Sequence, residues 1–248
     1  MQPHCIPCGV RARASRIVQH STVDVVIPAL NEASTIGRVL DEIPFAELAS
    51  SGFDTRAVVV DNGSSDGTAE VARSKGAEVI VEPQRGKGNA VRRAFRETHA
   101  DYVVMLDGDA TYPATHIPDM LKVLRDGHDV VIGSRLKGTR APGSISRVNV
   151  IGNYLLTWIA CVLYWKKTSD LCTGYWAFRG SVLPSLRLSA RGFNLEAELF
   201  SEVARHRLRM GEVPIHYRRR PTPAKLRALR DGARIARMLV RKRLRRNG

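Results

Sequence analysis

Two aspartates separated by one glycine, Asp107-Gly108-Asp109, follow the apolar run Tyr-Val-Val-Met-Leu in the middle of the chain. Residues two apart on an extended chain point the same way, so both carboxylates can face one ligand, and Gly108 lets that ligand approach the backbone. Two hard oxygen donors with open coordination positions suit Mg²⁺ or Mn²⁺ bound jointly with phosphate oxygens. The tripeptide alone more often forms an Asx turn at the end of a strand, so its interpretation depends on the motifs around it.

Three further polar motifs come earlier in the chain, and each also follows an apolar run. They are Val-Val-Ile-Pro-Ala-Leu-Asn-Glu (25–32), Val-Val-Asp-Asn-Gly-Ser-Ser-Asp-Gly-Thr (59–68) and Arg-Gly-Lys-Gly-Asn-Ala (85–90). Glu32 and the pair Asp61-Asn62 could accept hydrogen bonds from ribose hydroxyls or from a base N–H. Lys87 lies between two glycines that free the backbone to approach a diphosphate, although a solvated loop lysine is the plainer alternative.

The elements that must position these motifs alternate between strand and helix. Short β-branched apolar runs predict strands at residues 23–28, 57–61, 78–81, 102–107 and 130–132. Helical periodicity predicts crossover helices at residues 36–43, 68–75, 89–97 and 117–124. Such a βαβ series predicts an α/β fold with a mostly parallel sheet that is covered on both faces and binds ligands beyond the carboxyl ends of its strands. All four motifs occupy that position.

Taken together, the four segments resemble in order and spacing the inverting family-2 glycosyltransferases of the GT-A fold, from about residue 23 to about residue 240. The resemblance implies a Rossmann-like domain that binds a nucleotide sugar, with Mg²⁺ or Mn²⁺ as the cofactor held by Asp107 and Asp109. The donor-binding residues that it implies in this half of the chain are Pro28, Ala29, Glu32, Val60, Asp61, Asn62, Lys87, Asp107, Gly108 and Asp109.

The second half of the chain narrows the resemblance. Its segments are Ile-Gly-Ser-Arg (132–135), Ser-Arg (146–147), Asp-Leu-Cys-Thr-Gly-Tyr (170–175), Gly-Phe-Asn-Leu-Glu-Ala-Glu (192–198) and Val-Pro-Ile (213–215). They resemble dolichol-phosphate mannose synthase and its polyprenyl-phosphate glycosyltransferase relatives. The resemblance implies that Arg135, Arg219 and Lys225 contact donor phosphate and that Arg147 lies near an acceptor phosphate. It also implies catalytic roles for Asp170, for Arg135 and for the two aspartates of the first motif.

The implied reaction moves one hexose from a donor of the GDP-mannose or UDP-glucose type to a polyprenyl or dolichyl phosphate. The chain departs from the mannose synthases at three places. Asn62 stands where many of them have a second acidic residue, so both donor types stay open. Thr111 replaces a glutamine metal ligand, so we expect two protein carboxylates on the metal, with Asp109 the more committed. Thr-Pro-Ala at 222–224 replaces Gly-Glu-Ser before Lys225, which predicts a stiffer loop.

Residues 148–165 form an uncharged stretch of eighteen residues between basic flanks, near the lower length limit of a transmembrane helix. Three polar residues at every fourth position, Asn149, Asn153 and Thr157, place a thin polar stripe on this helix. A single crossing would put segment 170–175 on the opposite side of the membrane from the two aspartates, and one site could not form. We therefore expect an interfacial or re-entrant helix whose aromatic residues suit the headgroup region. A helix in the core of a soluble domain is the alternative.

The net charge of +15 is concentrated at the C-terminal end. From Arg205 onward, fourteen arginines and two lysines face one glutamate and one aspartate, so this part carries +14. An apolar residue recurs here at spacings of three and four, at Leu226, Leu229, Ala233, Ala236, Val240 and Leu244. With arginines one residue later, this pattern predicts a basic amphipathic helix that suits an anionic membrane surface. Nucleic acid is the less favoured partner, because it would explain the charge but not the apolar stripe.

These features divide the chain into an extension over residues 1–21, a transferase domain over 22–220 and a C-terminal helix within 221–248. The four cysteines include one CxxC pair, Cys5 and Cys8, without a second pair to complete a zinc site. The first twenty residues lack the continuous apolar stretch of a secretory signal. We therefore expect a cytoplasmic protein with reduced thiols that is peripheral on the inner face of the membrane.

Two other functions stay open at this point. The same fold could transfer the sugar to a hydroxyl of a glycan or small molecule. That reaction needs a positioned carboxylate as general base, and the candidates are Asp170, Glu196 and Glu198. The chain could also be a non-catalytic protein that binds membranes or nucleic acid, but such a protein would have no use for the Asp-Gly-Asp site.

Overall fold

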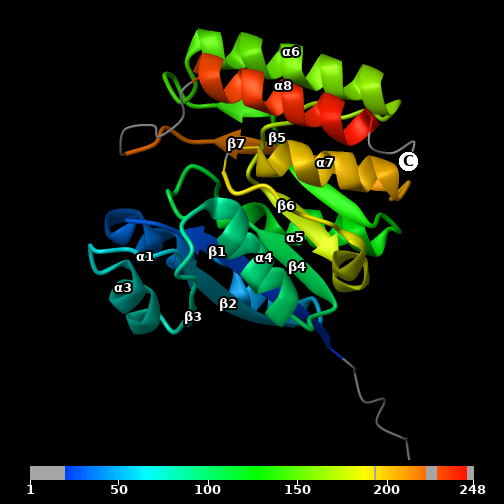
Figure 1. Ribbon diagram of the computed structural model, residues 1–248. Helices are drawn as coiled ribbons and strands as arrows, with labels where there is room; N and C mark the ends of the chain where they lie inside the picture. Colours follow the sequence, from blue (N-terminus) through cyan, green and yellow to red (C-terminus); the bar gives the residue numbers. More distant parts are fainter. Residues whose placement is uncertain (1–19, 193, 222–227, 245–248) are drawn as a thin grey trace, which may run out of the picture.

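The computed structural model describes residues 20–192, 194–221 and 228–244. The first nineteen residues, which include the Cys5–Cys8 pair, lie outside this part, and so does Lys225 with the Thr-Pro-Ala segment before it. The described residues form an α/β protein built around a central sheet (Figure 1).

The sheet has seven strands. In chain order they are β1 Ser21–Ala29, β2 Phe53–Asp61, β3 Glu78–Val81, β4 Tyr102–Met105, β5 Val130–Arg140, β6 Trp176–Arg179 and β7 Met210–Tyr217. Across the sheet the order is β3-β2-β1-β4-β6-β5-β7. Pairing is parallel except around β6, which runs antiparallel to both β4 and β5. The predicted α/β fold with a mostly parallel sheet is therefore confirmed.

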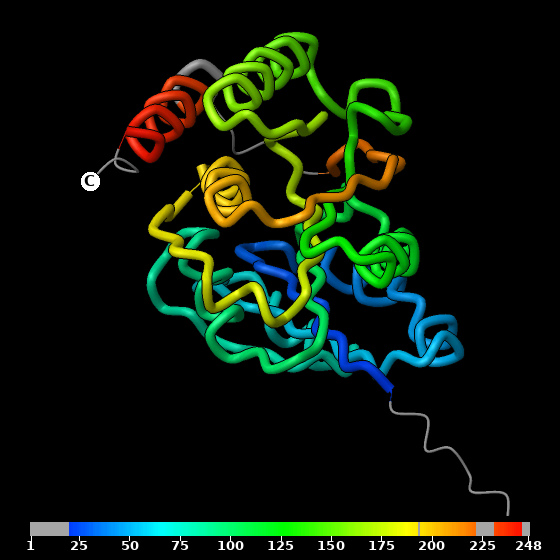
Figure 2. The backbone as a smooth tube through the Cα atoms, turned by 90° about the vertical axis from the view of Figure 1, so that its right-hand side faces the viewer, coloured from blue at the N-terminus to red at the C-terminus, as the bar shows by residue number. Residues whose placement is uncertain are grey.

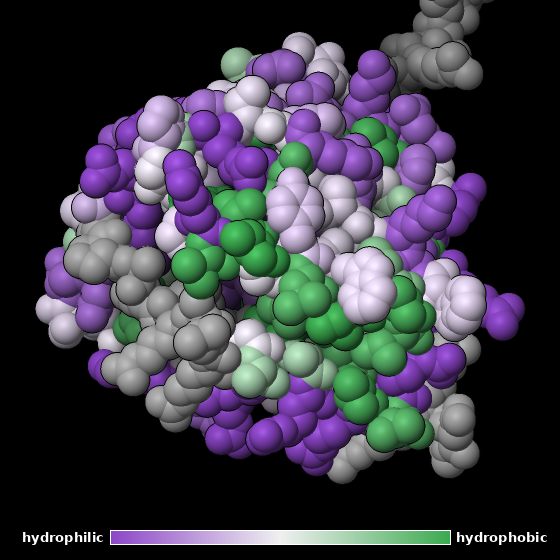
Figure 3. Space-filling model, turned by 90° about the horizontal axis from the view of Figure 1, so that it is seen from above, coloured by the Kyte–Doolittle hydropathy of each residue, from purple (hydrophilic) through white to green (hydrophobic). Residues whose placement is uncertain are grey.

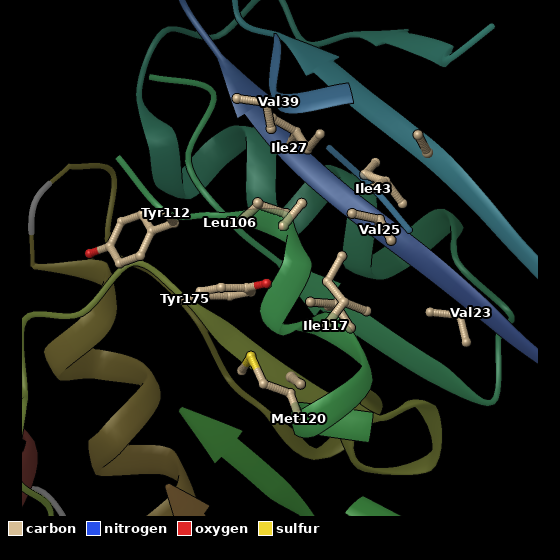
Figure 4. Packing of buried hydrophobic residues seen from close by; sticks show 14 of the residues in the cluster. Val23, Val25, Ile27, Val39, Ile43, Leu106, Tyr112, Ile117, Met120 and Tyr175 are labelled. Carbon is tan, nitrogen blue, oxygen red and sulfur yellow. The ribbon is translucent and has the colours of Figure 1, made fainter. Parts of the chain in front are cut away.

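Helices cover both faces of the sheet. In chain order they are α1 Ala33–Asp41, α2 Phe45–Ser50, α3 Thr68–Ser74, α4 Lys87–Glu97, α5 Ile117–Arg125, α6 Arg147–Tyr164, α7 Leu195–Arg205 and α8 Ala228–Leu244. On one face, Val39, Ile117 and Met120 of α1 and α5 share an apolar cluster with Val25 and Ile27 of β1 (Figure 4). On the other face a second cluster joins α4 and α7 to α6 and α8. Figure 2 shows α6 and α8 beyond α7, as the outermost layer of this face.

The predicted strands and crossover helices are all present, β3 with the predicted ends and the others with shifted ends. β2 begins at Phe53, β4 stops at Met105, and β5 continues to Arg140. The sequence did not predict α2, β6, α7 or β7. β6 is a strand of four residues, too short to show a period, and α7 is buried from Leu195 to Ala204 even though it carries the acidic side chains Glu196, Glu198 and Glu202.

The helix expected at residues 148–165 is α6, and its polar stripe faces the protein. Asn153 and Thr157 are 7% and 6% exposed. Asn153 Nδ2 donates to Asp170 Oδ1 at 2.6 Å, and Thr157 Oγ1 accepts from Leu171 N at 3.1 Å. The outward side chains, all at least half exposed, are Val148, Ile151, Tyr154, Leu155, Trp158 and Val162. We call these six side chains the α6 apolar face.

The α6 apolar face reverses the usual polarity of a surface helix, which buries its apolar side. It forms much of a large apolar patch in the space-filling view (Figure 3). This exposure contradicts the alternative of a helix enclosed in a soluble core. No helix in the described part of the chain has the length and apolar content needed to cross a membrane.

The predicted C-terminal helix is α8, but the apolar stripe assigned to it from the sequence is not the one that packs against the protein. Ile235 and Leu239 form the buried stripe, at 5% and 0% exposed, while Val240 and Leu244 are 42% and 69% exposed. Tyr164 Oη donates to the Leu239 carbonyl at 2.9 Å and ties α8 to α6. The prediction missed the inward stripe because Ile235 and Leu239 form a second i,i+4 pair on another face of the same helix.

Candidate active site

The carboxyl ends of β2, β1 and β4 meet at one edge of the sheet. Ala29 at the end of β1 is paired with Asp61 at the end of β2, and Asn62 N donates to the Ala29 carbonyl at 2.9 Å. Because β4 is parallel to β1, the chain leaves it at the same edge and turns there through Asp107 and Asp109. The fold therefore brings three of the four predicted motifs together.

Asp109 is nearly buried beside Asp107. Its Oδ1 accepts hydrogen bonds from Thr111 N at 3.1 Å and from Thr111 Oγ1 at 2.6 Å. Burial raises the pKa of Asp109, and the negative charge of Asp107 raises it further. Ala110 adopts a left-handed φ of 59°, which is strained for a residue other than glycine. The turn thus holds two carboxylates together against their repulsion, an arrangement that a divalent cation would stabilise.

Lys87, the first residue of α4, belongs to the same cluster. Its Nζ lies 2.6 Å from Asp107 Oδ1 and 2.6 Å from Glu196 Oε1 of α7. Burial alone would lower the pKa of Lys87, but the two carboxylates raise it above the ordinary value, so the lysine stays charged. The alternative of a solvated loop lysine is wrong, because the side chain is only 20% exposed.

The two glycines beside Lys87 allow a close backbone contact rather than open space for a ligand. A Cβ at Gly86 would overlap the Arg191 carbonyl oxygen, and one at Gly88 would overlap that of Ala190. Gly86 also has a φ of 130°, a conformation that disfavours other residues. The loop before α7 therefore supports the segment that carries Lys87.

This supporting loop is fixed in turn by α7 and α8. Glu198, 1% exposed, accepts hydrogen bonds from Ser189 N at 2.8 Å and Ala190 N at 2.7 Å. Lys242 of α8 lies 2.7 Å from the other Glu198 oxygen and 2.9 Å from Glu202. The position of Lys87 is thus connected, through Glu198, to a helix of the outer layer.

Asn62 fixes the other end of the same segment. Its Nδ2 donates to the carbonyls of Glu82 at 3.0 Å and Gln84 at 2.8 Å, and its Oδ1 accepts from Gly86 N at 2.5 Å. These bonds use both donors of the amide, so the side chain orients the loop between β3 and α4.

Arg220, just beyond β7, contacts two residues of the predicted site. Its Nη2 donates to Glu32 Oε1 at 2.7 Å, and its Nε lies 3.4 Å from Asp109 Oδ2. A hydrogen bond from Arg218 N to the Thr111 carbonyl at 2.9 Å holds this end of the strand against the aspartate turn. Arg220 was not predicted. Arginines occupy the three adjacent positions 218–220, and the sequence alone does not show which of them reaches the site. The predicted residue, Arg219, is exposed.

Arg135 and Asp170 form a buried ion pair beside the cluster. Arg135 Nε and Nη2 donate to the two oxygens of Asp170 at 2.8 and 2.7 Å, and Arg135 N donates to Oδ2 at 3.0 Å. Burial alone would raise the pKa of Asp170, but the charge and hydrogen bonds of Arg135, with the hydrogen bond from Asn153, lower it. Asp170 is fully buried, so in this structure it orients Arg135.

Gly174, which precedes β6, packs directly against Asp107. A Cβ at Gly174 would overlap Asp107 Oδ2, and Gly174 N donates to the Tyr112 hydroxyl at 2.8 Å. Only glycine leaves room for the carboxylate at this point, because the clash would be with a side chain held by Lys87.

Replacing Gly174 with alanine tests the placement of Asp107. We expect Gly174→Ala to displace the carboxylate and to reduce turnover about a hundredfold, as misplacements near 1 Å do in active sites. Steady-state kinetics with a nucleotide-sugar donor would measure the loss. Gly232→Ala is the matched control, because no atom lies within 4 Å of the place that a Cβ would take there. Equal kinetics for Gly174→Ala and the wild type would show that Asp107 does not have to stay in this position.

Comparison with known proteins decides the family. Residues 24–186 match glycosyl transferase family 2. The chain belongs to this family. As a family 2 transferase it is an enzyme, so the alternative of a non-catalytic binding protein is set aside.

The transferase is 37% identical over 223 residues to glycosyltransferase AglJ of Haloferax volcanii, with 89% of this chain and 71% of AglJ aligned. It is 35% identical over 218 residues to a dolichyl-phosphate hexose transferase of the same organism, with 88% and 92% aligned. Among solved structures, it resembles glucosyl-3-phosphoglycerate synthase from Mycobacterium tuberculosis in complex with Mn²⁺, UDP and glucosyl-3-phosphoglycerate. The TM-score is 0.66 at 27% identity, over 91% of this chain and 80% of the synthase. The predicted GT-A fold is confirmed.

The other donor residues predicted for the transferase lie at the strand ends. Pro28, Ala29 and Val60 are buried in β1 and β2, so they can offer a ligand only their main chain. Asp61 is 6% exposed, and it accepts from Ser64 N at 3.3 Å. The Gly108 carbonyl accepts from the Thr35 hydroxyl at 2.8 Å, which fixes the aspartate turn against α1. Their contacts with a donor stay predictions.

Arg147, the predicted acceptor residue of the transferase, is exposed in the first turn of α6. The helix is capped there by Ser146 Oγ, which accepts from Asn149 N at 3.2 Å. The turn borders a groove of about 390 Å³ lined by Arg140, Ala141, Ser144, Ile145, Arg147, Val150 and Ile151. The groove combines two arginines with aliphatic side chains.

Proposed function

We propose that this transferase moves a hexose from a nucleotide diphosphate sugar to a polyprenyl or dolichyl phosphate, with inversion at the anomeric carbon. The observation that carries the proposal is the continuity between the α6 apolar face and the groove at its first turn. Arg140 and Arg147 suit a phosphate, while Val150 and Ile151 suit the isoprenoid chain attached to it. The relative at 35% identity is named for dolichyl-phosphate hexose transfer, which supports this acceptor.

The donor proposed for the strand-end cluster is of the GDP-mannose or UDP-glucose type. A departing nucleoside diphosphate builds up negative charge in the transition state, which positioned cations stabilise. Lys87 and Arg220 supply such charge in the cluster. Arg135, Arg219 and Lys225 complete the proposed phosphate contacts. The Mycobacterium synthase was solved in complex with Mn²⁺ and UDP, which supports a nucleoside diphosphate donor.

We propose Mg²⁺ or Mn²⁺ at Asp107 and Asp109, with Asp109 the more committed ligand. The two adjacent carboxylates fit a hard divalent cation, and burial together with the charge of Asp107 disfavours a bare carboxylate at Asp109. Nowhere in the described part of the chain do three His, Cys, Asp or Glu side chains group as a metal site, so donor phosphate and water would complete the coordination. The bound cation would neutralise charge on the diphosphate.

A phosphate acceptor needs little help from a general base. Its second pKa is about 6, so it is already a nucleophile at neutral pH. Two of the three carboxylates considered as a base are occupied. Asp170 pairs with Arg135, and Glu198 accepts two backbone N–H groups. Both are buried, which supports an acceptor that brings its own charge.

Transfer to a hydroxyl is the second candidate, because one carboxylate does face the aspartate cluster. Glu196 lies 2.6 Å from Lys87 Nζ. If Glu196 were the general base, Glu196→Gln would abolish transfer to a hydroxyl acceptor such as a phosphoglycerate. On the proposed function, Glu196→Gln keeps measurable transfer to polyprenyl phosphate, since it removes only one of two carboxylates that hold Lys87.

We further propose that the protein acts at the inner face of a membrane, where the α6 apolar face and the basic α8 contact an anionic lipid surface. Two apolar side chains of α8, Val240 and Leu244, are exposed. Arg241 and Arg237 of the same helix are exposed. Nucleic acid is not favoured as a partner, because it would leave the apolar face uncovered.

The deciding experiment is incubation with a panel of labelled UDP- and GDP-sugars, polyprenyl phosphate and Mg²⁺ or Mn²⁺, followed by organic extraction. The proposal expects label in the organic phase with one donor and only with a divalent cation. No label in that phase with any donor would refute it.

Arg147 offers a specific test of the acceptor. Arg147→Ala removes a charge-assisted contact, so we expect the KM for polyprenyl phosphate to rise about 10–100-fold while the KM for the donor stays unchanged. Arg96→Ala, an exposed arginine of α4, is the matched control. An unchanged acceptor KM in Arg147→Ala would remove this groove from the acceptor site.

A further inference from the structure

A second basic pocket lies at the opposite end of α6 from Arg147. It has a volume of about 350 Å³ and is lined by Tyr164, Trp165, Lys166, Ala204, Arg207 and Arg243. This volume lies within the range of small-molecule sites, roughly 300–1,000 Å³. With α6 spanning 18 residues, the two pockets lie roughly 27 Å apart along one helix. We call it the α6 C-terminal pocket.

The ends of three helices meet at this pocket. α6 ends at Tyr164, α7 at Arg205 and α8 at Leu244. Two of the cations satisfy main-chain carbonyls there: Lys166 Nζ donates to the Leu208 carbonyl and Arg243 Nε to the Leu163 carbonyl, both at 2.8 Å. These two bonds explain where the side chains lie, but each uses only one donor of its side chain.

The remaining charge of the pocket has no carboxylate against it. Within the described residues, Lys166, Arg207 and Arg243 form no ion pair. Asp129 acts on Lys166 only from a distance, and its own Oδ2 accepts from Arg209 N at 2.7 Å. Burial lowers the pKa of Lys166, with Asp129 opposing the shift. The three cations exceed the partial negative charge, about half a unit each, of the three helix C-termini, so the pocket favours an anion with several oxygens, such as a phosphate.

The pocket also adjoins the apolar surface. Trp165, 88% exposed, follows directly on α6 at the rim of the pocket and adopts a left-handed φ of 52°. Trp158 and Val162, which lie earlier on α6, are 64% and 51% exposed. An exposed tryptophan between an apolar face and basic residues is the arrangement found at the level of lipid headgroups.

We propose that the α6 C-terminal pocket binds the phosphate of an anionic phospholipid headgroup, at a site separate from the acceptor groove. The lipid source follows from the apolar face, because a free phosphate would leave Trp165 and the α6 apolar face in water. The proposal rests on the proposed attachment of α6 to a membrane. Two phosphate contacts at the two ends of one helix fix the direction of α6 along the membrane surface, so the active site meets the acceptor in one orientation.

The test compares Arg207→Glu with Arg73→Glu, an equal charge change on α3, far from the outer helix layer (Figure 1). Arg207 has no side-chain partner among the described residues, so its replacement should leave folding intact. Lys166→Gln serves as a second variant in the pocket. Binding is measured by co-sedimentation with vesicles of phosphatidylcholine alone or mixed with phosphatidylglycerol.

We expect Arg207→Glu to weaken binding to the mixed vesicles about thirtyfold. Each unit of charge near an anionic surface contributes roughly fivefold to binding, and replacing arginine with glutamate changes the charge by two units. Arg73→Glu should change it less than twofold. If both variants lost vesicle binding equally, the loss would reflect the overall charge of the protein, and the proposed headgroup site would be refuted. If soluble glycerophosphate competed for the pocket as strongly as vesicles do, that result would identify a free phosphate as the ligand and refute the proposed lipid headgroup.

A separate measurement distinguishes this proposal from the proposed function. Transfer to a short, water-soluble polyprenyl phosphate should be unaffected by Arg207→Glu, whereas Arg147→Ala impairs it. If no donor and polyprenyl phosphate react at all, the proposed function fails, and the vesicle comparison still decides whether the pocket binds anionic lipid.

Discussion

Replacing Asp109 with asparagine is expected to reduce sugar transfer about a thousandfold, because a divalent cation contributes several kcal/mol of transition-state charge stabilisation and we propose Asp109 as its more committed ligand. The fold should survive. Burial and the adjacent Asp107 raise the pKa of Asp109, so its charged form is disfavoured in the metal-free protein. Asp109→Asn removes that charge and its ion pair with Arg220, while the Thr111 hydrogen bonds to the retained oxygen can persist.

Two measurements separate metal binding from folding in this variant. Without metal, Asp109→Asn should melt near the wild-type temperature, because the lost repulsion from Asp107 and the lost contact with Arg220 oppose each other. With Mn²⁺, the wild type should gain thermal stability and the variant should not. Asp126→Asn, an exposed carboxylate at the end of α5, is the control and should behave as the wild type. Full transfer activity in Asp109→Asn would contradict the assignment of the aspartate pair.

The second large effect concerns the stability of the protein. Asp170→Asn leaves Arg135 buried without its counter-charge, and breaking a buried ion pair costs about 3–5 kcal/mol. We expect the melting temperature to fall by roughly 6–20 °C, since about 2–4 °C is lost per kcal/mol in a domain of this size. Activity falls with it because Arg135 loses its orientation, so Asp170→Asn does not by itself distinguish phosphate from hydroxyl acceptors.

The ion pair also predicts a pH dependence. The pKa of Asp170 is lowered in the folded protein, so its contribution to stability is present above the ordinary value of 3.8 and is lost as the pH falls below it through the lowered value. Asp170→Asn should remove this acid-dependent component in thermal melts recorded across that range. Asp54→Asn, an exposed carboxylate of β2, should retain it.

A double replacement checks the cause of the instability. If the loss in Asp170→Asn comes from the uncompensated arginine, Arg135→Leu/Asp170→Leu should be more stable than either single variant. A double variant less stable than both would instead assign the loss to packing.

The parallel half of the fold could be predicted because its signals are local. Each strand there is a β-branched run followed directly by a polar motif, and parallel strands bring those motifs to one edge. The residues at 61, 87, 107 and 109 were found in this way, and the structure places them at the ends of adjacent strands and at the start of α4.

The rest of the site depends on contacts between distant segments, which periodicity does not reveal. Arg220 reaches Glu32 and Asp109 only because β7 ends beside the aspartate turn. Gly174 meets Asp107 only because β6 inserts antiparallel beside β4. In α8, two apolar stripes share one helix, and only packing against α6 and α7 shows that Ile235 and Leu239 are the inward one.

The reversed polarity of α6 places the protein between two conflicting demands. Substituting Ile151, Leu155 or Trp158 with charged residues would make the isolated protein easier to keep dispersed in water, because each is more than half exposed. The same substitutions would leave the packing of the helix on the fold untouched, since α6 is buried at Asn153, Thr157, Ala160 and Tyr164. If α6 holds the protein on a lipid surface as proposed, such a variant would stay dispersed and folded after losing that attachment, so a well-behaved preparation of it is a poor guide to where the natural chain works.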